Sequence, residues 1–266
     1  MVNYYPSYLT LSEFTQHTDH ECVCENISLR FDVFSKSTSL IDWSVLDDYI
    51  GLALPQIVRW SPSKPLPKTV RIKVFEDYTP KRLPRKGAAL TPDHINSGLT
   101  YTYGDWDRTN IEIFRMQEFP KVLCHELLHF FNVGISKEQN DRLSTKVASV
   151  FNTPALQTIN VNEALTELNA VVLNAAILSS TSLLDSLEEE YRHTEATISR
   201  IRDHFGLTSN DWSRWKETTH AFSYLVLRHL FMGELLGHNG AFNCAQKSGE
   251  KEFTMTKAAL IFKKLT

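Results

Sequence analysis

From near Phe119 onward the pattern of apolar residues is helical, whereas the part before it is rich in strand patterns, and this difference limits the folds that the chain can adopt. Before Phe119, apolar and polar residues alternate in Ile27–Phe34 and in Thr69–Asp77, as they do in strands with one buried face. After Phe119, apolar residues recur every three to four positions, as they do in amphipathic helices. A strand-rich first part followed by a helical second part predicts an α+β protein.

Two further elements are predicted in the first part. Gly98–Tyr103 and Asn110–Met116 alternate on either side of the sequence GDWD, which predicts a hairpin. Trp43–Trp60 has helical spacing, with Asp42 as its N-cap and Pro55 as a break or kink.

The second part is predicted to be a series of helices. Helical spacing is found in segments 119–132, 137–151, 161–180, 182–205 and 211–232, with a last one near 251–264. The helix over 182–205 has one mainly apolar stripe, and Gly206 predicts where it ends. The stripe consists of Leu184, Leu187, Tyr191, Thr194, Ile198, Ile201 and Phe205. We therefore expect an N-terminal extension (1–41), a lobe with a small mixed sheet (42–135) and a mostly helical lobe (136–266).

The composition argues against several classes of protein. The 266 residues carry a formal net charge of -3, whereas nucleic-acid-binding proteins usually have a basic excess. The N-terminus lacks the basic and apolar regions of a signal peptide, and no apolar run is long enough to span a bilayer. Four cysteines in a chain of this length do not form a disulfide scaffold. We expect a cytoplasmic or otherwise intracellular protein without nucleic-acid or membrane partners, and the oligomeric state is left open.

The segment KVLCHELLHFFN, Lys121–Asn132, carries the most specific chemical signal. Residues four apart lie on the same face of a helix, so His125 and His129 can bind one metal ion. Glu126 projects beside that ion, where a base can take a proton from a zinc-activated water molecule. The segment is apolar nearly all round, which predicts burial, and buried histidine and glutamate side chains need partners. The alternative is a metal-free helix in which H-E-x-x-H occurs by chance.

A catalytic zinc ion usually has three protein ligands and a water molecule, so a third ligand is needed. The metzincin continuation H-x-x-G-x-x-H is absent from the sequence. Glu163 and Glu167 lie one helical turn apart in VNEALTELNA. We predict that Glu163 is the third ligand and that Glu167 accepts the N–H of a ligating histidine and fixes its tautomer. The alternative is two solvated carboxylates on an amphipathic helix.

The two motifs together resemble the gluzincin group of zinc metallopeptidases. In that group a second motif similar to N-E-x-x-(S/T)-(D/E) follows HExxH, and its first glutamate binds zinc; here NEALTE occupies 162–167. The order of elements over residues 42–232 is also similar: a helix, strands ending in an edge strand, the HExxH helix and a helical lobe. The resemblance implies a zincin-like fold and zinc-dependent hydrolysis of peptide bonds. No subfamily is assigned.

The resemblance implies two further parts of a site. Gluzincins usually supply a Tyr or His from the helical lobe to stabilise the oxyanion, and TTHAFSYLVLRHL places His220, or one turn later Tyr224, at the matching distance. An edge strand before the HExxH helix usually pairs with the substrate backbone, which makes the strand with Asn110 and Glu112 the candidate. A core strand without a substrate role is the alternative. No G-x-M-E-N-like aminopeptidase motif precedes HELLH, which favours an endopeptidase.

Four residues near the N-terminus could hold a second metal ion. These are His17, His20, Cys22 and Cys24, whose spacing lacks the C-x-x-C arrangement common in structural zinc sites. A second ion therefore stays an open alternative.

Two hypotheses follow from these patterns. The first is a zinc-dependent peptidase that acts on a peptide or protein substrate through Glu126. The second is a zincin-fold protein whose zinc is structural and which acts as an assembly or binding module.

Overall fold

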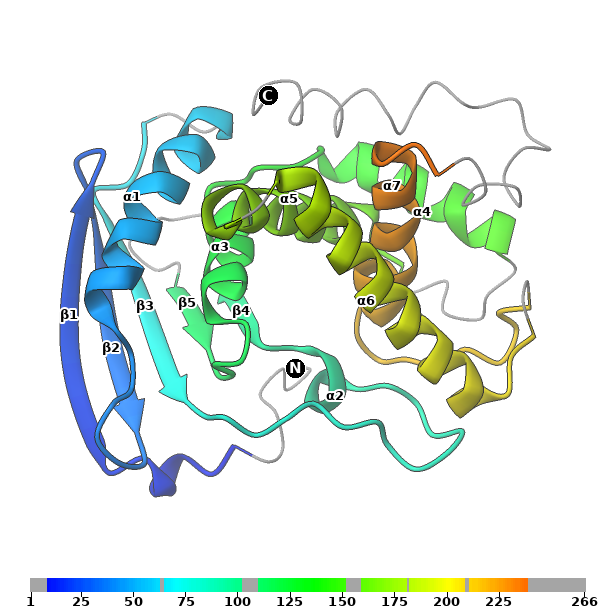
Figure 1. Cartoon of the computed structure of the whole chain (residues 1–266), viewed down its shortest axis with the longest axis horizontal. Helices are drawn as coiled ribbons and strands as arrows, with labels where there is room; N and C mark the ends of the chain where they lie inside the picture. The colour runs from blue at the N-terminus through cyan, green and yellow to red at the C-terminus, as the bar shows by residue number, and fades with distance from the viewer. Residues whose placement is uncertain are drawn as a thin grey trace. The chain divides into compact units, whose positions relative to one another are not determined.

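The computed structural model of the chain describes residues 9–62, 65–101, 110–151, 159–180, 182–208 and 211–238. These residues form an α+β protein, with strands in the first half of the chain and mostly helices in the second (Figure 1). They fall into two compact units, which we describe one at a time. The sheet unit lies within Met1–Lys81 and Asn96–Gly134, and the helical unit within Arg82–Ile95 and Ile135–Thr266.

The sheet unit is built on a mixed five-stranded sheet with the order β1-β2-β3-β5-β4. Its strands are β1 (Gln16–Cys24), β2 (Ile27–Ser35), β3 (Thr69–Glu76), β5 (Asn110–Ile113) and β4 (Gly98–Tyr101). The β1–β2 and β4–β5 pairs are antiparallel, whereas β2–β3 and β3–β5 are parallel. Glu25 and Asn26 join β1 to β2 with φ angles of 52° and 61°, the left-handed conformation that a two-residue hairpin turn requires.

One row of side chains crosses all five strands and shows how the sheet is covered. In register order it consists of His20, Phe31, Ile72, Ile111 and Thr100. Its three central residues are at most 1% exposed. At the two ends of the row, His20 bonds to Asp47 of a helix and Thr100 bonds to Glu126 of another. The helices of this unit therefore pack on the face of the sheet to which this row points.

The first of these helices is α1 (Trp43–Trp60), which has the bounds that the sequence predicts. Asp42 caps it by accepting hydrogen bonds from the backbone N–H groups of Ser44 and Val45, as predicted. Pro55 lies inside the helix without breaking it, because the chain stays helical to Trp60. The second helix, α3 (Phe119–Phe130), contacts α1, β4 and β5.

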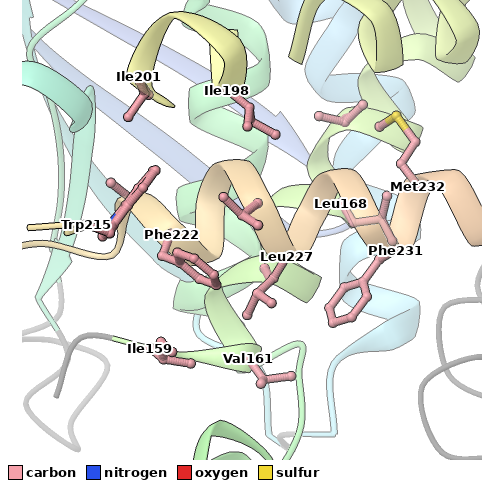
Figure 2. Close-up of a cluster of buried hydrophobic side chains, with 14 of the residues drawn as sticks. Ile159, Val161, Leu168, Ile198, Ile201, Trp215, Phe222, Leu227, Phe231 and Met232 are labelled. Carbon is pink, nitrogen blue, oxygen red and sulfur yellow. The ribbon is translucent and has the colours of Figure 1, made fainter. Parts of the chain in front are cut away.

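The helical unit surrounds one large apolar core. It contains α2 (Pro92–Ile95), α4 (Lys137–Phe151), α5 (Val161–Leu178), α6 (Leu183–Phe205), the π-helical turn η4 (Ser223–Leu227) and α7 (Arg228–Leu235). Figure 2 shows side chains of α5, α6, η4 and α7 meeting in this core around Trp215 and Phe222. Trp215 and Phe222 are both 0% exposed, and their rings pack edge to face.

The structure corrects several sequence-based boundaries. Residues 16–35 are not part of a separate extension, because they form β1 and β2 of the sheet. Residues 82–95 belong to the helical unit although they precede the histidine helix. The helix expected over 211–232 begins only at residue 221. Leu184 of the predicted stripe is 56% exposed, near the first turn of α6. The GDWD turn and the helix near 251–264 lie outside the described residues.

We also searched the described helices for a membrane-spanning segment. None of them combines the length and the apolar character needed to cross a bilayer.

Candidate metal centre

His125 and His129 lie one turn apart on α3, and their rings pack edge to face with an interplanar angle of 66°. Their Nε2 atoms are 3.0 Å apart and their ring centroids 4.7 Å apart. With Zn–N distances of about 2.0–2.1 Å, two imidazole nitrogens in a tetrahedral zinc site lie roughly 3.3 Å apart. The pair therefore has nearly the spacing of two ligands of one ion.

Glu126, the residue between the two motif histidines that is expected to act as a base, packs against the strand β4. It is 6% exposed, as is His125. The hydroxyl of Thr100 donates to Oε2 of Glu126 at 2.7 Å and also lies 3.1 Å from the backbone oxygen of Glu126. The carboxylate is therefore buried but hydrogen-bonded, as a buried polar group must be.

The sequence around the motif explains why α3 holds these groups inside the protein. Apolar residues cover most of the helix, and Leu123, Leu127, Leu128 and Phe130 are at most 1% exposed. Cys124 is also buried, and its thiol hydrogen-bonds with Tyr49 of α1, where burial is the main cause of a raised pKa of Tyr49. Cys124 therefore packs in the core of the sheet unit.

The C-terminal end of α3 is fixed by a turn directly after His129. Asn132 has a φ angle of 54°, in the left-handed region. Its N–H donates to the carbonyl of His129 at 3.0 Å, and the N–H of Val133 donates to Leu128 at 2.8 Å. These two bonds form a Schellman motif with asparagine at the left-handed position.

The remaining predicted site residues belong to the helical unit. Glu163 lies in the first turn of α5 and is half-buried, and Glu167 follows one turn later and is also half-buried. A carboxylate in the first turn of a helix is favoured by the helix dipole.

The turn that carries Glu163 is anchored by side chains of three segments. Asn160 caps α5 by accepting the N–H of Glu163 at 3.2 Å. The other N–H groups of this turn donate to side-chain oxygens: Asn160 to Ser223 (2.8 Å), Val161 to Ser144 (3.2 Å) and Asn162 to Asn140 (2.8 Å). Because side chains accept hydrogen bonds from these N–H groups, the first turn of α5 is fixed, and Glu163 lies on a well-ordered backbone.

His220 and Tyr224, the two candidates for the oxyanion donor, flank the start of the π-helical turn η4. Both are half-buried, and the N–H of Tyr224 donates to the carbonyl of His220 at 3.0 Å. Ser223, the residue before Tyr224, is fully buried, and its hydroxyl oxygen accepts the N–H of Asn160. This bond ties η4 to the turn of Glu163, and π-helical turns often occur at functional sites.

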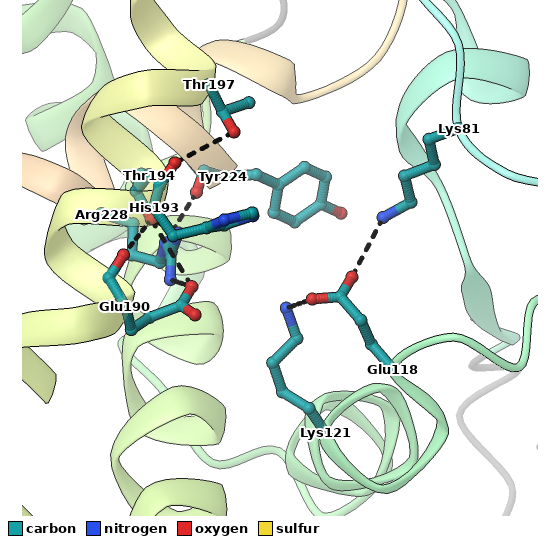
Figure 3. A network of polar contacts seen from close by, with 9 residues as sticks. All are labelled: Lys81, Glu118, Lys121, Glu190, His193, Thr194, Thr197, Tyr224 and Arg228. Carbon is teal, nitrogen blue, oxygen red and sulfur yellow. Dashed lines mark hydrogen bonds and ion pairs between the residues drawn. The ribbon is translucent and has the colours of Figure 1, made fainter. Parts of the chain in front are cut away.

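A buried arginine holds the other side of η4. Arg228 is 4% exposed, and Figure 3 shows its guanidinium among Glu190, Thr194 and Tyr224. It donates to Oε1 of Glu190 at 2.7 Å, to the hydroxyl of Thr194, and through Nε to the carbonyl of Tyr224 at 3.1 Å. Charge-assisted bonds of this kind are about twice as strong as neutral ones, so Arg228 fixes the backbone at Tyr224.

The prediction that Asn110 and Glu112 lie on an edge strand is wrong. Asn110 and Glu112 lie on β5, which is an interior strand because β3 pairs with one side of it and β4 with the other. Glu112 is 5% exposed and lies 3.6 Å from Lys73 of β3. The edge of the sheet on this side is β4, which pairs only with β5 among the described strands.

The four residues considered for a second metal ion do not come together as one group. Successive residues of a strand point to opposite faces, so His17 points away from His20, Cys22 and Cys24. His20 bonds to Asp47 at 2.8 Å and stacks on Trp43, while burial, followed by Asp47, raises the pKa of Cys22 to about 11. Without a metal ion, Cys22 is therefore a protonated thiol at neutral pH.

On the opposite face, His17 belongs to a different group. Its ligand nitrogen and carboxylate oxygens of Asp19 and Asp32 lie within 4.8 Å of one another. All three side chains are at least 47% exposed, and exposed acidic groups of this kind are common without an ion.

Thr100 and Gly98 are the neighbours of Glu126 that sequence reasoning missed. A strand pattern predicts that residues 98 and 100 share a face, but it does not predict which helix packs on that face. The packing of α3 on β4 supplies that information.

Comparison of the chain with protein-family models, with curated proteins and with solved structures finds no match.

Proposed function

We propose that this chain is a zinc-dependent peptidase with a zincin-like arrangement, in which His125, His129 and Glu163 bind the metal ion. The observation that carries the proposal is the pair of imidazoles on the buried helix α3, with Nε2 atoms 3.0 Å apart and Glu126 beside them. A metal ion shared by the two rings would give these imidazoles, on a helix that is otherwise apolar and buried, the polar partner that buried groups need.

The donor set fits zinc. Each of His125, His129 and Glu163 offers one ligand atom, two imidazole nitrogens and one carboxylate oxygen in total. Zinc binds these atom types, and two histidines with one glutamate are a known catalytic set that leaves a fourth position for water. The anchored first turn of α5 supports Glu163, since a ligand on a fixed backbone loses little entropy on binding. In this proposal Glu167 accepts the N–H of a ligating histidine.

Peptide hydrolysis requires a base, an acid and a donor for the oxyanion. Bound zinc would supply a water molecule with a pKa near 7 and would polarise the scissile carbonyl. Glu126 takes a proton from the attacking water and passes it to the nitrogen of the leaving amine, so the carboxylate is regenerated. His220, or alternatively Tyr224, donates a hydrogen bond to the carbonyl oxygen as negative charge develops there.

The substrate is proposed to be an extended peptide that adds to the sheet at β4. This strand, Gly98–Tyr101, is the edge strand beside Glu126, and an exposed edge offers backbone N–H and C=O groups to a peptide. Because an edge strand can pair with the middle of a chain as well as with its end, the arrangement favours an endopeptidase.

The decisive experiment combines zinc analysis with cleavage of a peptide library. We expect about one zinc ion per purified chain and cleavage that a chelator stops and added zinc restores. Glu126→Gln should keep the zinc and lose cleavage by about a thousandfold or more, because it removes the base and leaves the ligands in place. Glu138→Gln, on the exposed start of α4, is the matched control and should behave like the wild type.

Two results would contradict the proposal. Cleavage by Glu126→Gln at the wild-type rate would exclude Glu126 as the base. A wild-type protein that binds zinc tightly but cleaves nothing in the library would favour the other hypothesis, a structural zinc ion in an assembly or binding module.

A further inference from the structure

We propose that Thr100 is a positioning residue for Glu126, and that Gly98 provides the space in which the carboxylate lies. The inference rests on the proposed function, because it concerns the base of that reaction. Neither residue belongs to the H-E-x-x-H motif, and both come from the edge strand β4.

The hydroxyl of Thr100 holds one oxygen, Oε2, of the Glu126 carboxylate. It donates to Oε2 of Glu126 at 2.7 Å and lies 3.1 Å from the backbone oxygen of the same residue. A hydroxyl has a single hydrogen, so the shorter bond to the charged oxygen dominates. Oε2 is thereby held by β4.

Gly98 provides the space in which the Glu126 carboxylate lies. It lies two residues before Thr100 and so points to the same face of β4. A Cβ atom at position 98 would lie 2.8 Å from Oε1 and 2.9 Å from Cγ of Glu126, and 2.9 Å from Cγ1 of Val122. These distances are shorter than real Cβ contacts, so any larger residue would push the carboxylate away.

An anchor for the Glu126 carboxylate matters because a glutamate side chain has three rotatable bonds. Without an anchor, the base samples several positions, and a displacement of about 1 Å can cost a reaction about a hundredfold in rate. The anchor also lies on the strand proposed to bind the peptide. A substrate that pairs with β4 therefore steadies Thr100 and Glu126 at the same time.

The test compares Thr100→Val, which keeps the shape but removes the hydroxyl, with Thr100→Ser, which keeps the hydroxyl. We expect Thr100→Val to lower kcat about tenfold to a hundredfold, with KM changed less than about threefold and zinc content unchanged. Thr100→Ser should restore kcat to within about threefold of the wild type. Thr145→Val, which removes an exposed hydroxyl on α4, is the matched control.

Gly98→Ala provides an independent variant. It should lower kcat by a similar factor, while Gly51→Ala, where a Cβ atom meets nothing within 4 Å, should leave kcat unchanged. A purely structural role for Thr100 would instead lower the melting temperature of Thr100→Val and leave kcat unaffected. A kcat of Thr100→Val within threefold of the wild type would overturn the proposal.

A crystal structure separates this inference from the proposed function. If the zinc-loaded wild type cleaves no peptide, the proposed function fails, but the position of Glu126 can still be compared in the wild type and in Thr100→Val. We expect Oε2 to stay bonded to Thr100 in the wild type and the carboxylate to turn away or take several rotamers in the variant. An unchanged carboxylate in Thr100→Val would refute the positioning role.

Discussion

His229 on α7 is a half-buried histidine that the fold keeps neutral near pH 7. Its ring stacks on Tyr191 with centroids 4.1 Å apart, and Tyr191 stacks on His238 at 4.7 Å. Burial, and after it the charges of Arg228 and His238, lower the pKa of His229 from 6.5 to about 4. Its Nδ1 atom is buried and has no hydrogen-bond partner among the described residues. Protonation would therefore place a charge where nothing in its stack neutralises it.

This environment predicts a loss of stability in mild acid. Between pH 6.5 and about 4 the unfolded chain binds a proton at His229 and the folded chain does not, so the free energy of unfolding falls as the pH falls. His229→Phe keeps the ring stack and removes the titration, so its stability should fall less over this range, by about 1 kcal/mol after allowance for solvent screening. Urea unfolding at pH 7 and pH 4 measures the difference. Equal pH dependence in both proteins would contradict it.

At the scale of single residues, the sequence predicts what local geometry determines. The four-residue spacing of His125 and His129 requires only a helix to bring the rings together, and α3 provides it. The neighbours of Glu126 depend instead on how α3 packs on β4, which involves a contact between distant segments. No local pattern marks Thr100 as the partner of a carboxylate 26 positions later.

At the scale of elements, the end of α3 depends on one backbone conformation. Asn132 follows α3 with a φ of 54°. This conformation lets the N–H groups of Asn132 and Val133 donate to the carbonyls of His129 and Leu128 at the end of the helix. Asparagine and glycine adopt this conformation more easily than other residues.

The end of α3 can be tested by two substitutions at an exposed position. Asn132→Ala should lower the free energy of unfolding by about 1 kcal/mol, because alanine is strained at positive φ. Asn132→Gly should be neutral within about 0.5 kcal/mol, since glycine adopts this φ freely. Chemical denaturation of both variants gives the comparison. Equal losses in the two would show that the asparagine side chain, rather than the backbone angle, stabilises the turn.

Helices and strands with strong periodicity were predictable, whereas their partners were not. The bounds of α1 and its Asp42 cap, and the existence of β2, β3, α4, α5 and α6, follow from spacing and end signals. The strand order does not, because β5 pairs in parallel with β3 and leaves its hairpin partner β4 at the edge. The strand β1 buries only Cys22, so its sequence lacks the apolar alternation that marks β2 and β3, and the π-helical turn η4 has no signal in the sequence.

At the scale of the whole molecule, the two compact units do not follow the linear order of the chain. The segment Arg82–Ile95 leaves the sheet unit and joins the helical unit before the chain returns at Asn96. Backbone bonds explain this: Leu90 N–H donates to Lys216 at 2.9 Å, and Thr218 N–H donates to Leu90 at 2.8 Å. Such pairing across more than a hundred positions cannot be seen in local periodicity.

The proposed metal site predicts how stability depends on zinc. The proposed ligands are divided between the units: His125 and His129 belong to the sheet unit, and Glu163 belongs to the helical unit. Zinc at about a thousand times its Kd should add about 4 kcal/mol to the free energy of unfolding, or roughly 10 °C in melting temperature. Because each unit supplies a ligand, calorimetry should show zinc raising the unfolding temperature of both.

Glu163→Gln separates this prediction from binding by the histidines alone. If Glu163 is a ligand, the variant should lose most of the zinc-induced shift, whereas Glu195→Gln on the exposed surface of α6 should keep all of it. The comparison needs no enzymatic activity, so it tests the metal site even if the substrate is never found. A full zinc shift in Glu163→Gln would mean that the helical unit takes no part in binding the ion. The proposed three-ligand centre would then have to be abandoned.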